Sequence, residues 1–351
     1  MHILIVKRGA LGDVVRTAYF ARALKERQGK GIRISWITST DALPLLRFNP
    51  YIDDVWTSFE EAGPYVLDIV FSLDDERDAL EGVASLCTHA LRGAFLHQAG
   101  QPTYSADTAE WFDMGLLSRL GKDCADNLKK RNTRGHAQIF ADIFGTPKPE
   151  PTFYGNPILE SQVEGEFGEN ALYIGINAYA GGRWPSKELP LAEQEGLIDA
   201  LLAWGRRMGW DLRVVLLGAG PDRKKNQDIA GRFGKEIQAA ETDNSVLRLA
   251  AVVSKMHYLI TSDSLPMHLA IAQRRPCLAF FCPTSAAEID DFGLCRKLVS
   301  TGPDYCSYKP GADNTSITAE RIMAALDHKW ISLSASSEAV ASDVRAGGEL
   351  N

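Results

Sequence analysis

The chain has 351 residues, of which 45% are hydrophobic and 24% are charged. This length predicts two domains, each large enough to bury its own core. With 38 basic and 45 acidic residues the net charge is −7, so the basic footprint of a nucleic-acid-binding protein is absent and no nucleic-acid partner is expected. No apolar run is long enough to span a membrane, and the first residues lack the order of a secretory signal, so we expect a cytoplasmic protein.

Short apolar runs alternate with amphipathic stretches along the first half of the chain, which is typical of parallel α/β architecture. In the helix expected over 14–27, Thr17, Phe20 and Leu24 follow a helical period, whereas charged residues such as Arg16 fall outside it. The pattern predicts strands over 2–6, 32–38, 54–57 and 68–73, and further helices over 42–48, 75–86, 108–120 and 133–144.

A proline-rich segment then interrupts this pattern. Four prolines fall within residues 146–157, and an acidic, weakly patterned stretch follows to Asn170. Because proline favours extended structure over helix, we expect a linker over 156–170. The linker separates an N-terminal domain (1–155) from a C-terminal domain (171–331), and the small, polar residues 332–351 predict a disordered tail.

The second half repeats the α/β layout. Strands are expected over 172–177, 212–217, 258–262 and 277–281, and helices over 191–208, 222–233, 245–255, 265–274 and 318–330. The prediction is an α/β protein of two doubly wound, Rossmann-like domains, with the carboxyl ends of both sheets facing a central cleft. Since such sheets bind ligands outside their carboxyl ends, functional residues are expected in the loops that follow the strands.

The six cysteines form no Cys-x-x-Cys pair and have no histidine at zinc-ligand spacing. Cys277 and Cys282 lie in an apolar run, where buried free thiols are expected. The sequence therefore predicts neither disulfides nor a zinc site.

The first strand leads into a loop that contains Gly12 and Asp13. Glycine lets a ligand approach the backbone, and the start of the next helix offers N–H groups and a partial positive charge. Asp13 is expected at or near the helix N-cap, where it either caps the helix or serves the chemistry. The loop is not Gly-x-Gly-x-x-Gly, and the second strand ends in residues 36–40 without the acidic residue that would bind a ribose, which disfavours a nicotinamide-dependent dehydrogenase.

Three further loops carry candidate ligand-binding residues. Residues 177–187 combine small residues with Arg183 and Lys187, which suits a diphosphate, although a solvated surface loop has the same composition. Asp222 follows a glycine-rich turn and either accepts from ribose hydroxyls or caps a helix.

The third of these loops contains Ser262, Asp263 and Ser264 and leads into a helix with Pro266 near its start. The N–H groups of that helix could bind a phosphate. His268 lies one turn inside, within reach of a phosphate or ribose oxygen, although a single helical histidine is often structural.

In this order the motifs resemble glycosyltransferase family 9, the heptosyltransferases. The resemblance rests on Gly-x-x-Gly-Asp at the N-terminus, Gly-Gly-Arg-Trp-Pro-Ser-Lys at 181–187, and Ser-Asp-Ser-x-x-x-His at 262–268. It implies the GT-B fold, ADP-heptose as donor, and inverting transfer without a metal or other cofactor. By position, Asp13 matches the catalytic base, Lys187 a donor-phosphate ligand, and Asp222 lies near an acidic ribose contact. Asp263, Ser264 and His268 match the family's donor loop.

The sequence thus predicts an inverting glycosyltransferase that moves a heptose to a hydroxyl on a glycan, natural product or protein. Arg183, Lys187 and the helix start near residues 262–264 would stabilise the leaving diphosphate. Another nucleotide-sugar donor, a nucleotide-sugar epimerase and a non-catalytic nucleotide-sugar-binding subunit remain alternatives. The expected partners are a nucleotide sugar and a hydroxyl-bearing acceptor. Membrane contact is at most peripheral, and the oligomeric state is left open.

Overall fold

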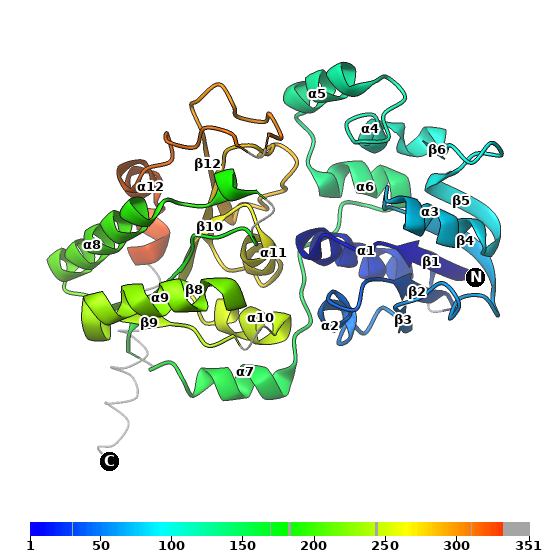
Figure 1. Cartoon of the computed structure of the whole chain (residues 1–351). Coiled ribbons are helices and arrows are strands. Elements are labelled where there is room, and N and C mark those ends of the chain that lie inside the picture. Colours follow the sequence, from blue (N-terminus) through cyan, green and yellow to red (C-terminus); the bar gives the residue numbers. More distant parts are fainter. Residues whose placement is uncertain (30, 169, 182–183, 243–244, 310, 333–351) are drawn as a thin grey trace, which may run out of the picture. The chain divides into compact units, whose positions relative to one another are not determined.

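The computed structural model describes residues 1–332 apart from 30, 169, 182–183, 243–244 and 310, so most of the expected tail lies outside the described residues. Its contacts divide the chain into two units (Figure 1). The first comprises Met1–Tyr154 together with Ala287–Asp290, and the second comprises Gly155–Ala286 and the residues from Asp291 on.

The first unit contains a six-stranded sheet in the order β3-β2-β1-β4-β5-β6, parallel except for the β5–β6 pair. Its strands are β1 (His2–Val6), β2 (Arg33–Ile37), β3 (Asp54–Trp56), β4 (Val66–Ser72), β5 (Cys87–Leu96) and β6 (Pro102–Tyr104). Its helices are α1 (Leu11–Gln28), α2 (Leu43–Leu46), α3 (Arg77–Ala84), α4 (Ala109–Phe112), α5 (Lys122–Arg131) and α6 (His136–Phe144), with a 3₁₀ turn at Ala106–Thr108.

The second unit contains a fully parallel sheet in the order β12-β11-β10-β7-β8-β9. Its strands are β7 (Leu172–Asn177), β8 (Leu212–Leu217), β9 (Ile237–Ala239), β10 (Tyr258–Ser262), β11 (Cys277–Phe281) and β12 (Cys295–Val299). Its helices are α7 (Pro157–Glu164), α8 (Leu191–Met208), α9 (Gly220–Phe233), α10 (Val246–Ser254), α11 (Leu265–Ala272) and α12 (Ala319–Ala325), with 3₁₀ turns at Pro185–Lys187 and Gly234–Glu236.

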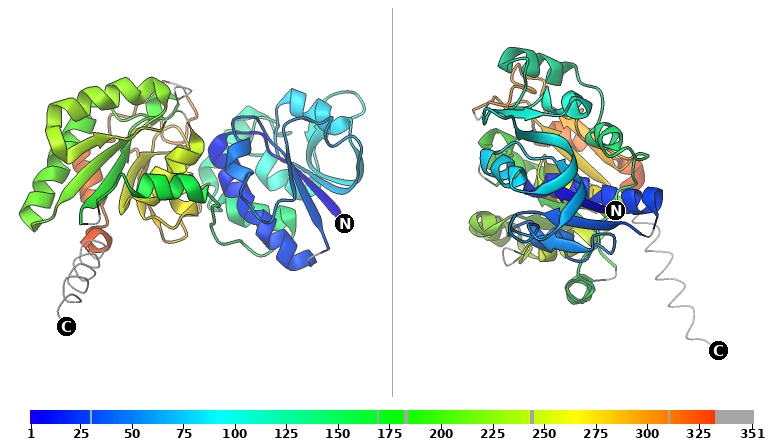
Figure 2. Two further views of the ribbon diagram at one scale, coloured as in Figure 1. Left: turned by 90° about the horizontal axis from the view of Figure 1, so that it is seen from below. Right: turned by 90° about the vertical axis from the view of Figure 1, so that its right-hand side faces the viewer.

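The central strands of both sheets are continuous apolar runs because each is covered on both faces. In β1 every residue from Ile3 to Val6 is buried, paired with β2 on one side and β4 on the other. All residues of β7 and β10 are buried as well. Figure 2 shows helices lying against each sheet, and uninterrupted burial of this kind is what a parallel sheet requires.

Both sheets have the strand order 3-2-1-4-5-6 when their strands are counted in chain order within each unit. The first and fourth strands are neighbours, and the connections that leave them run in opposite directions. These switch points lie between β1 and β4 in the first unit and between β7 and β10 in the second. The predicted fold of two doubly wound α/β sheets is confirmed, and the loops at the two switch points are where ligands bind in such sheets.

Several local expectations are wrong. The segment expected to be an extended linker contains helix α7, because Pro157 takes the first helical position and the Asn156 side chain accepts from the N–H of Ile158 at 3.0 Å. The helix expected over 108–120 is only the short α4, since the chain turns after Phe112 toward Gly115. Strands β5, β6, β9 and β12 and helix α5 were not expected.

Candidate functional site

The carboxyl end of β10 carries an ion pair inside the second unit. The ammonium of Lys187 lies 2.7 Å from Oδ2 of Asp263 and also donates to the Asp263 carbonyl at 3.1 Å. Lys187 reaches this position from the 3₁₀ turn Pro185–Lys187, in the loop that follows β7. The two side chains are only 13% and 10% exposed, so the pair is largely removed from water.

Asp263 is ionised despite its burial. Burial alone would raise the pKa of its carboxyl, but the Lys187 ammonium and a hydrogen bond from Thr284 outweigh burial and hold the pKa below its ordinary value, with a further contribution from His268. The Thr284 hydroxyl, in the loop after β11, donates to Oδ2 at 2.6 Å. Three separate loops therefore meet at this one carboxylate.

A polar network adjoins the pair at the switch point. The side-chain amide of Asn177, the last residue of β7, donates to the Tyr179 carbonyl at 2.9 Å and to the hydroxyl of Ser264 at 3.0 Å. The Ser262 hydroxyl donates to the same carbonyl at 2.5 Å, and its oxygen lies 2.9 Å from the Ser264 hydroxyl. These bonds fix the turn after β7 against the turn after β10, from residues that are more than 80 positions apart in the sequence.

Ser264 occupies the N-cap position of α11 with an extended backbone, and its side chain makes no capping bond to the helix. Pro266 lies in the first turn, where its missing N–H costs nothing. His268 is the fourth helical residue and is 93% buried. The first-turn N–H groups of α11 give this end of the helix a partial positive charge.

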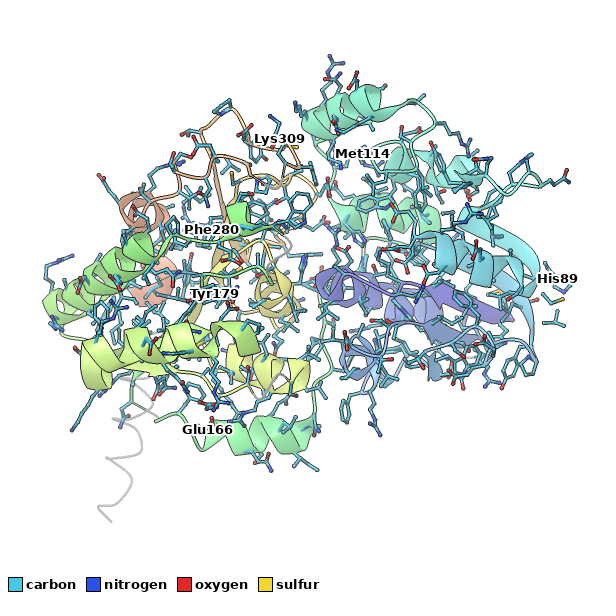
Figure 3. The ribbon with its side chains drawn as sticks, in the orientation of Figure 1. His89, Met114, Glu166, Tyr179, Phe280 and Lys309 are labelled. Carbon is cyan, nitrogen blue, oxygen red and sulfur yellow. The ribbon has the colours of Figure 1, made fainter. Side chains whose placement is uncertain are left out.

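Asp222 lies beside this network, on α9. The N-cap position of α9 is Ala219, so Asp222 is not the cap but the third helical residue, and it is buried. Its carboxylate lies 3.6 Å from the ammonium of Lys225, which in turn lies 5.0 Å from the centre of the ring of Tyr179, a residue labelled in Figure 3. Burial, followed by the Asp222 carboxylate, raises the pKa of Tyr179 to about 12, so its phenol stays protonated.

Gly218 makes the turn between β8 and α9 narrow. A Cβ at this position would lie 2.9 Å from Cβ of Asp222 and 3.0 Å from Nδ2 of Asn226. A larger residue would therefore push α9 away from the loop. The glycine brings the start of α9 close to the aromatic ring of Tyr179.

In the first unit, Asp13 is the third residue of α1 rather than its cap. The N-cap position is Ala10, and no side chain caps the helix. The Asp13 side chain is 31% exposed, and its Oδ1 lies 2.8 Å from Nη2 of Arg16. Gly12 precedes it as a buried helical residue. The interpretation of Asp13 as a helix cap is wrong, because its side chain forms an ion pair one turn along the helix.

A second cation lies near Asp13 at the switch point of the first sheet. Lys7, directly after β1, pairs with Asp74, directly beyond β4, at 2.7 Å. Burial alone would lower the pKa of Lys7, but the carboxylates of Asp74 and Asp13 outweigh it and raise the pKa. Lys7 is therefore a buried, charged ammonium within electrostatic reach of Asp13.

The structure brings most of the predicted donor residues into one group. Lys187, Ser262, Asp263 and Ser264 share contacts, and the charge of His268 acts on Asp263. We call Asn177, Lys187, Ser262, Asp263, Ser264 and Thr284 the second-unit cluster. Asn177 and Thr284 escaped the sequence analysis, although Asn177 ends an apolar strand and Thr284 is the third residue after one. Arg183 lies outside the described residues.

Residues 134–308, about half of the chain, match the sequence model of glycosyltransferase family 9 (heptosyltransferase). The chain carries a glycosyltransferase family 9 domain. The protein is therefore a glycosyltransferase, as the sequence motifs predicted. The matched residues include the whole second-unit cluster and Asp222, whereas Gly12 and Asp13 lie outside them.

Solved structures support this family 9 assignment at the level of fold. A glycosyltransferase family 9 protein from Veillonella parvula is 17% identical, with a TM-score of 0.71 over 94% of this chain and 97% of that chain. E. coli ADP-heptose lps heptosyltransferase II is 16% identical, with a TM-score of 0.64 over 94% and 98%. E. coli heptosyltransferase WaaC with ADP is 15% identical, with a TM-score of 0.60 over 92% and 96%. These likenesses show the GT-B fold. No curated protein sequence is significantly similar to the chain.

Four further features of this family 9 glycosyltransferase concern a cavity, metal ligands, membrane-spanning helices and cysteines. A cavity of about 300 Å³ lies at the amino end of the second sheet, lined by Tyr173, Arg213 and Gln238 among others, away from the second-unit cluster. Within the described residues no group of three or more metal-ligating side chains occurs, and no helix is long and apolar enough to cross a bilayer. Cys277 and Cys282 are buried free thiols, as predicted.

Proposed function

We propose that the protein transfers a heptose from ADP-heptose to a hydroxyl of a glycan, natural product or protein, with inversion at the anomeric carbon. The family 9 domain supports the reaction class. WaaC, which shares the fold, has been solved with ADP and with ADP-2-deoxy-2-fluoro heptose. The observation that carries the proposal is the second-unit cluster, because it combines a buried ammonium with a helix N-terminus at a sheet switch point.

Lys187 is suited to hold the diphosphate. An ammonium has three donors, and among the described residues the contacts of Lys187 use two of them, both on Asp263. The third is available to a phosphate oxygen. Because Asp263 and Thr284 fix the ammonium before the donor arrives, binding the diphosphate requires little ordering of the lysine side chain.

The start of α11 supplies a second attraction for the phosphates. Its first-turn N–H groups carry a partial positive charge that strengthens as negative charge grows on the leaving group. Together with Lys187 it provides the charge that a metal supplies in other diphosphate sites. We therefore assign no metal to the transfer, and we expect turnover to be unchanged by EDTA.

Asp222 and Tyr179 are suited to the nucleoside. A buried carboxylate can accept from two ribose hydroxyls, and Tyr179 offers an aromatic ring beside it. Because Gly218 has no Cβ, the backbone at this position can lie close to both Asp222 and Tyr179. In this proposal the ribose lies against the start of α9.

Asp13 acts as the general base. The acceptor oxygen attacks the anomeric carbon, the bond between that carbon and the phosphate oxygen breaks, ADP leaves, and the hydroxyl proton passes to Asp13. A carboxylate near Arg16 and Lys7 is a weak base. A weak base suffices if bond breaking leads, because the attacking hydroxyl becomes acidic only late in the reaction.

The donor is tested by thermal shift with ADP-, GDP-, UDP- and dTDP-sugars. A ligand that binds only the native state raises the melting temperature by mass action. We expect ADP-heptose to give the largest shift, and Lys187→Met to remove most of it. A preference for UDP or dTDP with no response to ADP would reject the heptose while leaving the glycosyltransferase in place.

The base is tested with Asp13→Asn, assayed by ADP release over an acceptor panel. We expect turnover to fall by about 10²–10⁴-fold while the thermal shift with ADP-heptose is kept. A variant that loses donor binding but keeps its turnover would assign Asp13 to binding instead.

A further inference from the structure

Arg16 is held by three groups of the first unit. Its Nη2 pairs with Asp13 at 2.8 Å, its guanidinium lies 5.6 Å from the centre of the Trp111 ring, and its Nη1 donates to the Glu288 carbonyl at 3.3 Å. The side chain is only 11% exposed, although the sequence pattern placed it on the polar side of α1. An arginine restrained in this way is not an ordinary surface charge.

The carbonyl that binds Arg16 belongs to Ala287–Asp290, a segment fixed to the start of α6. The Glu288 carbonyl also accepts from the N–H of His136 at 2.9 Å. The Asp290 carboxylate accepts from the N–H of Ala137 at 2.6 Å and pairs with Lys148 at 2.6 Å. Gly135 leaves no space beside it, since a Cβ there would lie 2.4–2.6 Å from the carboxylate. The segment thus presents its carbonyl at a defined position.

We propose that Arg16 is a positioning residue for Asp13, which fixes the orientation of the carboxylate and keeps it ionised during turnover. The proposal rests on the proposed function of Asp13 as base. An aspartate at the third position of a helix can adopt several rotamers. A restrained guanidinium limits this aspartate to the rotamers that bring its carboxylate to the N–H donors of the arginine.

The charges around Asp13 determine how far Arg16 controls its ionisation. Within the first unit the charged groups near it are Arg16 on its own helix, Lys7 after β1 and, behind Lys7, Asp74 beyond β4. Glu288 lies on the segment that binds Arg16. Asp74 pairs with Lys7, whereas Arg16 contacts the Asp13 carboxylate directly, so Arg16 is the cation that we expect to act on it most strongly.

The direct test is a carboxyl titration by ¹³C NMR of protein labelled at aspartate, with Asp13→Asn identifying the Asp13 signal. In Arg16→Met we expect the midpoint of Asp13 to move to higher pH, because the adjacent positive charge is lost. Arg16→Lys keeps the charge and should remain closer to the wild type. Arg22→Met, which removes an exposed arginine of the same helix, is the matched control and should change nothing.

The kinetic test separates positioning from folding. In Arg16→Met we expect kcat to fall roughly 10–100-fold with the KM for the donor unchanged, and the acidic limb of the pH profile to move to higher pH. Arg16→Lys should restore part of kcat. If Arg16→Met does not fold, Arg16→Lys against Arg22→Met decides, since a lysine cannot reproduce the fork of an arginine.

An unchanged Asp13 titration in Arg16→Met, together with an unchanged kcat, would overturn the proposal. The failure of the proposed function looks different: Asp13→Asn would then keep full turnover, whatever the titration of Asp13 shows. The two outcomes are read from different variants and are therefore distinguishable.

Discussion

Asp263 is a buried carboxylate that stays ionised because of the groups around it. Lys187 and Thr284 both bond its Oδ2, and the lysine places an opposite charge in direct contact with the carboxylate. For a pair this far from water the lost hydration offsets most of the attraction, so the net contribution to folding is small. Removing one partner destabilises the folded protein strongly, because the buried charge of the other partner is left uncompensated.

Lys187→Met should therefore destabilise the protein by about 3–5 kcal/mol, measured by urea unfolding. The double variant Lys187→Met/Asp263→Leu should recover much of that loss, since neither charge then remains buried. A double variant as unstable as the sum of the two single variants would show that the two side chains act separately.

The same pair gives a stability that depends on pH. The pKa of Asp263 is lower in the folded protein than its ordinary value of 3.8, so its contribution is fully present above that value and is lost as the pH falls through the folded pKa. We expect Asp263→Asn to flatten the acid side of the stability profile, measured by unfolding between pH 5 and pH 2. In Lys187→Met the sign should reverse, with acid reducing the deficit, because protonation then removes a buried unpaired charge.

At the scale of elements, the long apolar strands and the amphipathic helices could be predicted. Strands β1, β7, β8, β10 and β11 are almost entirely buried, so their sequences are largely apolar and their limits match the expected ranges. Strand β5 could not be predicted this way. Eight of its ten residues are exposed or partly exposed, and His89 and Arg92 break any apolar run.

The extended conformation expected for residues 156–170 is wrong because proline has two opposite effects on helices. Inside a helix it is disruptive, whereas at the first helical position it is favourable, and only the capping residue before it distinguishes the two. Asn156 before Pro157 carried that signal. The site shows a similar limit: Asn177, Ser262 and Thr284 come from three strands whose adjacency is set by the sheet order rather than by local sequence.

Helix α7 provides a test of this capping signal. Asn156→Ala removes the side-chain acceptor for the N–H of Ile158 and should cost about 0.5–2 kcal/mol of stability in urea unfolding. Hydrogen exchange of the first-turn amides of α7 should become faster. Asn156→Asp, which keeps an acceptor, is the control. Equal effects from the alanine and aspartate variants would argue against capping.

Two glycines, one just before α9 and one near its end, lead to opposite predictions for substitution by alanine. Gly218→Ala places a Cβ against Asp222 and Asn226 and should cost about 1–3 kcal/mol, while also weakening ADP binding. Gly231→Ala, on the exposed side of the same helix with nothing within 4 Å, should be neutral or stabilise the protein by up to about 1 kcal/mol. The two are compared by urea unfolding and by the thermal shift with ADP. A Gly218→Ala variant as stable as Gly231→Ala would show that the turn has room.

At the scale of the whole molecule, both units have the same strand order and place charged side chains at their switch points, but the charges differ. The second unit has Lys187 and the start of α11, which suit an anion, whereas the first has the Asp13 carboxylate between two cations. We therefore expect nucleotide binding to stabilise the second unit first.

Hydrogen exchange of the whole chain with and without ADP tests this difference. Protection should appear in peptides that cover residues 177–187, 218–222 and 262–268, where the proposed function places the nucleotide. Asp222→Ala serves as a control that should reduce the protection without abolishing the phosphate contacts. Protection that appeared first around Lys7 and Asp13 would place the nucleotide on the first unit and contradict the assignment.

The segment Ala287–Asp290 has a consequence for how the protein is made. It supplies the carboxylate and the carbonyl that bind the start of α6, yet a ribosome translates it more than 140 residues after that helix. During synthesis the start of α6 therefore lacks these two partners until residues 287–290, which follow β11, have left the exit tunnel. Domains generally fold in the order of their synthesis, but here the first unit is complete only after a segment that the gene encodes within the second unit has been translated.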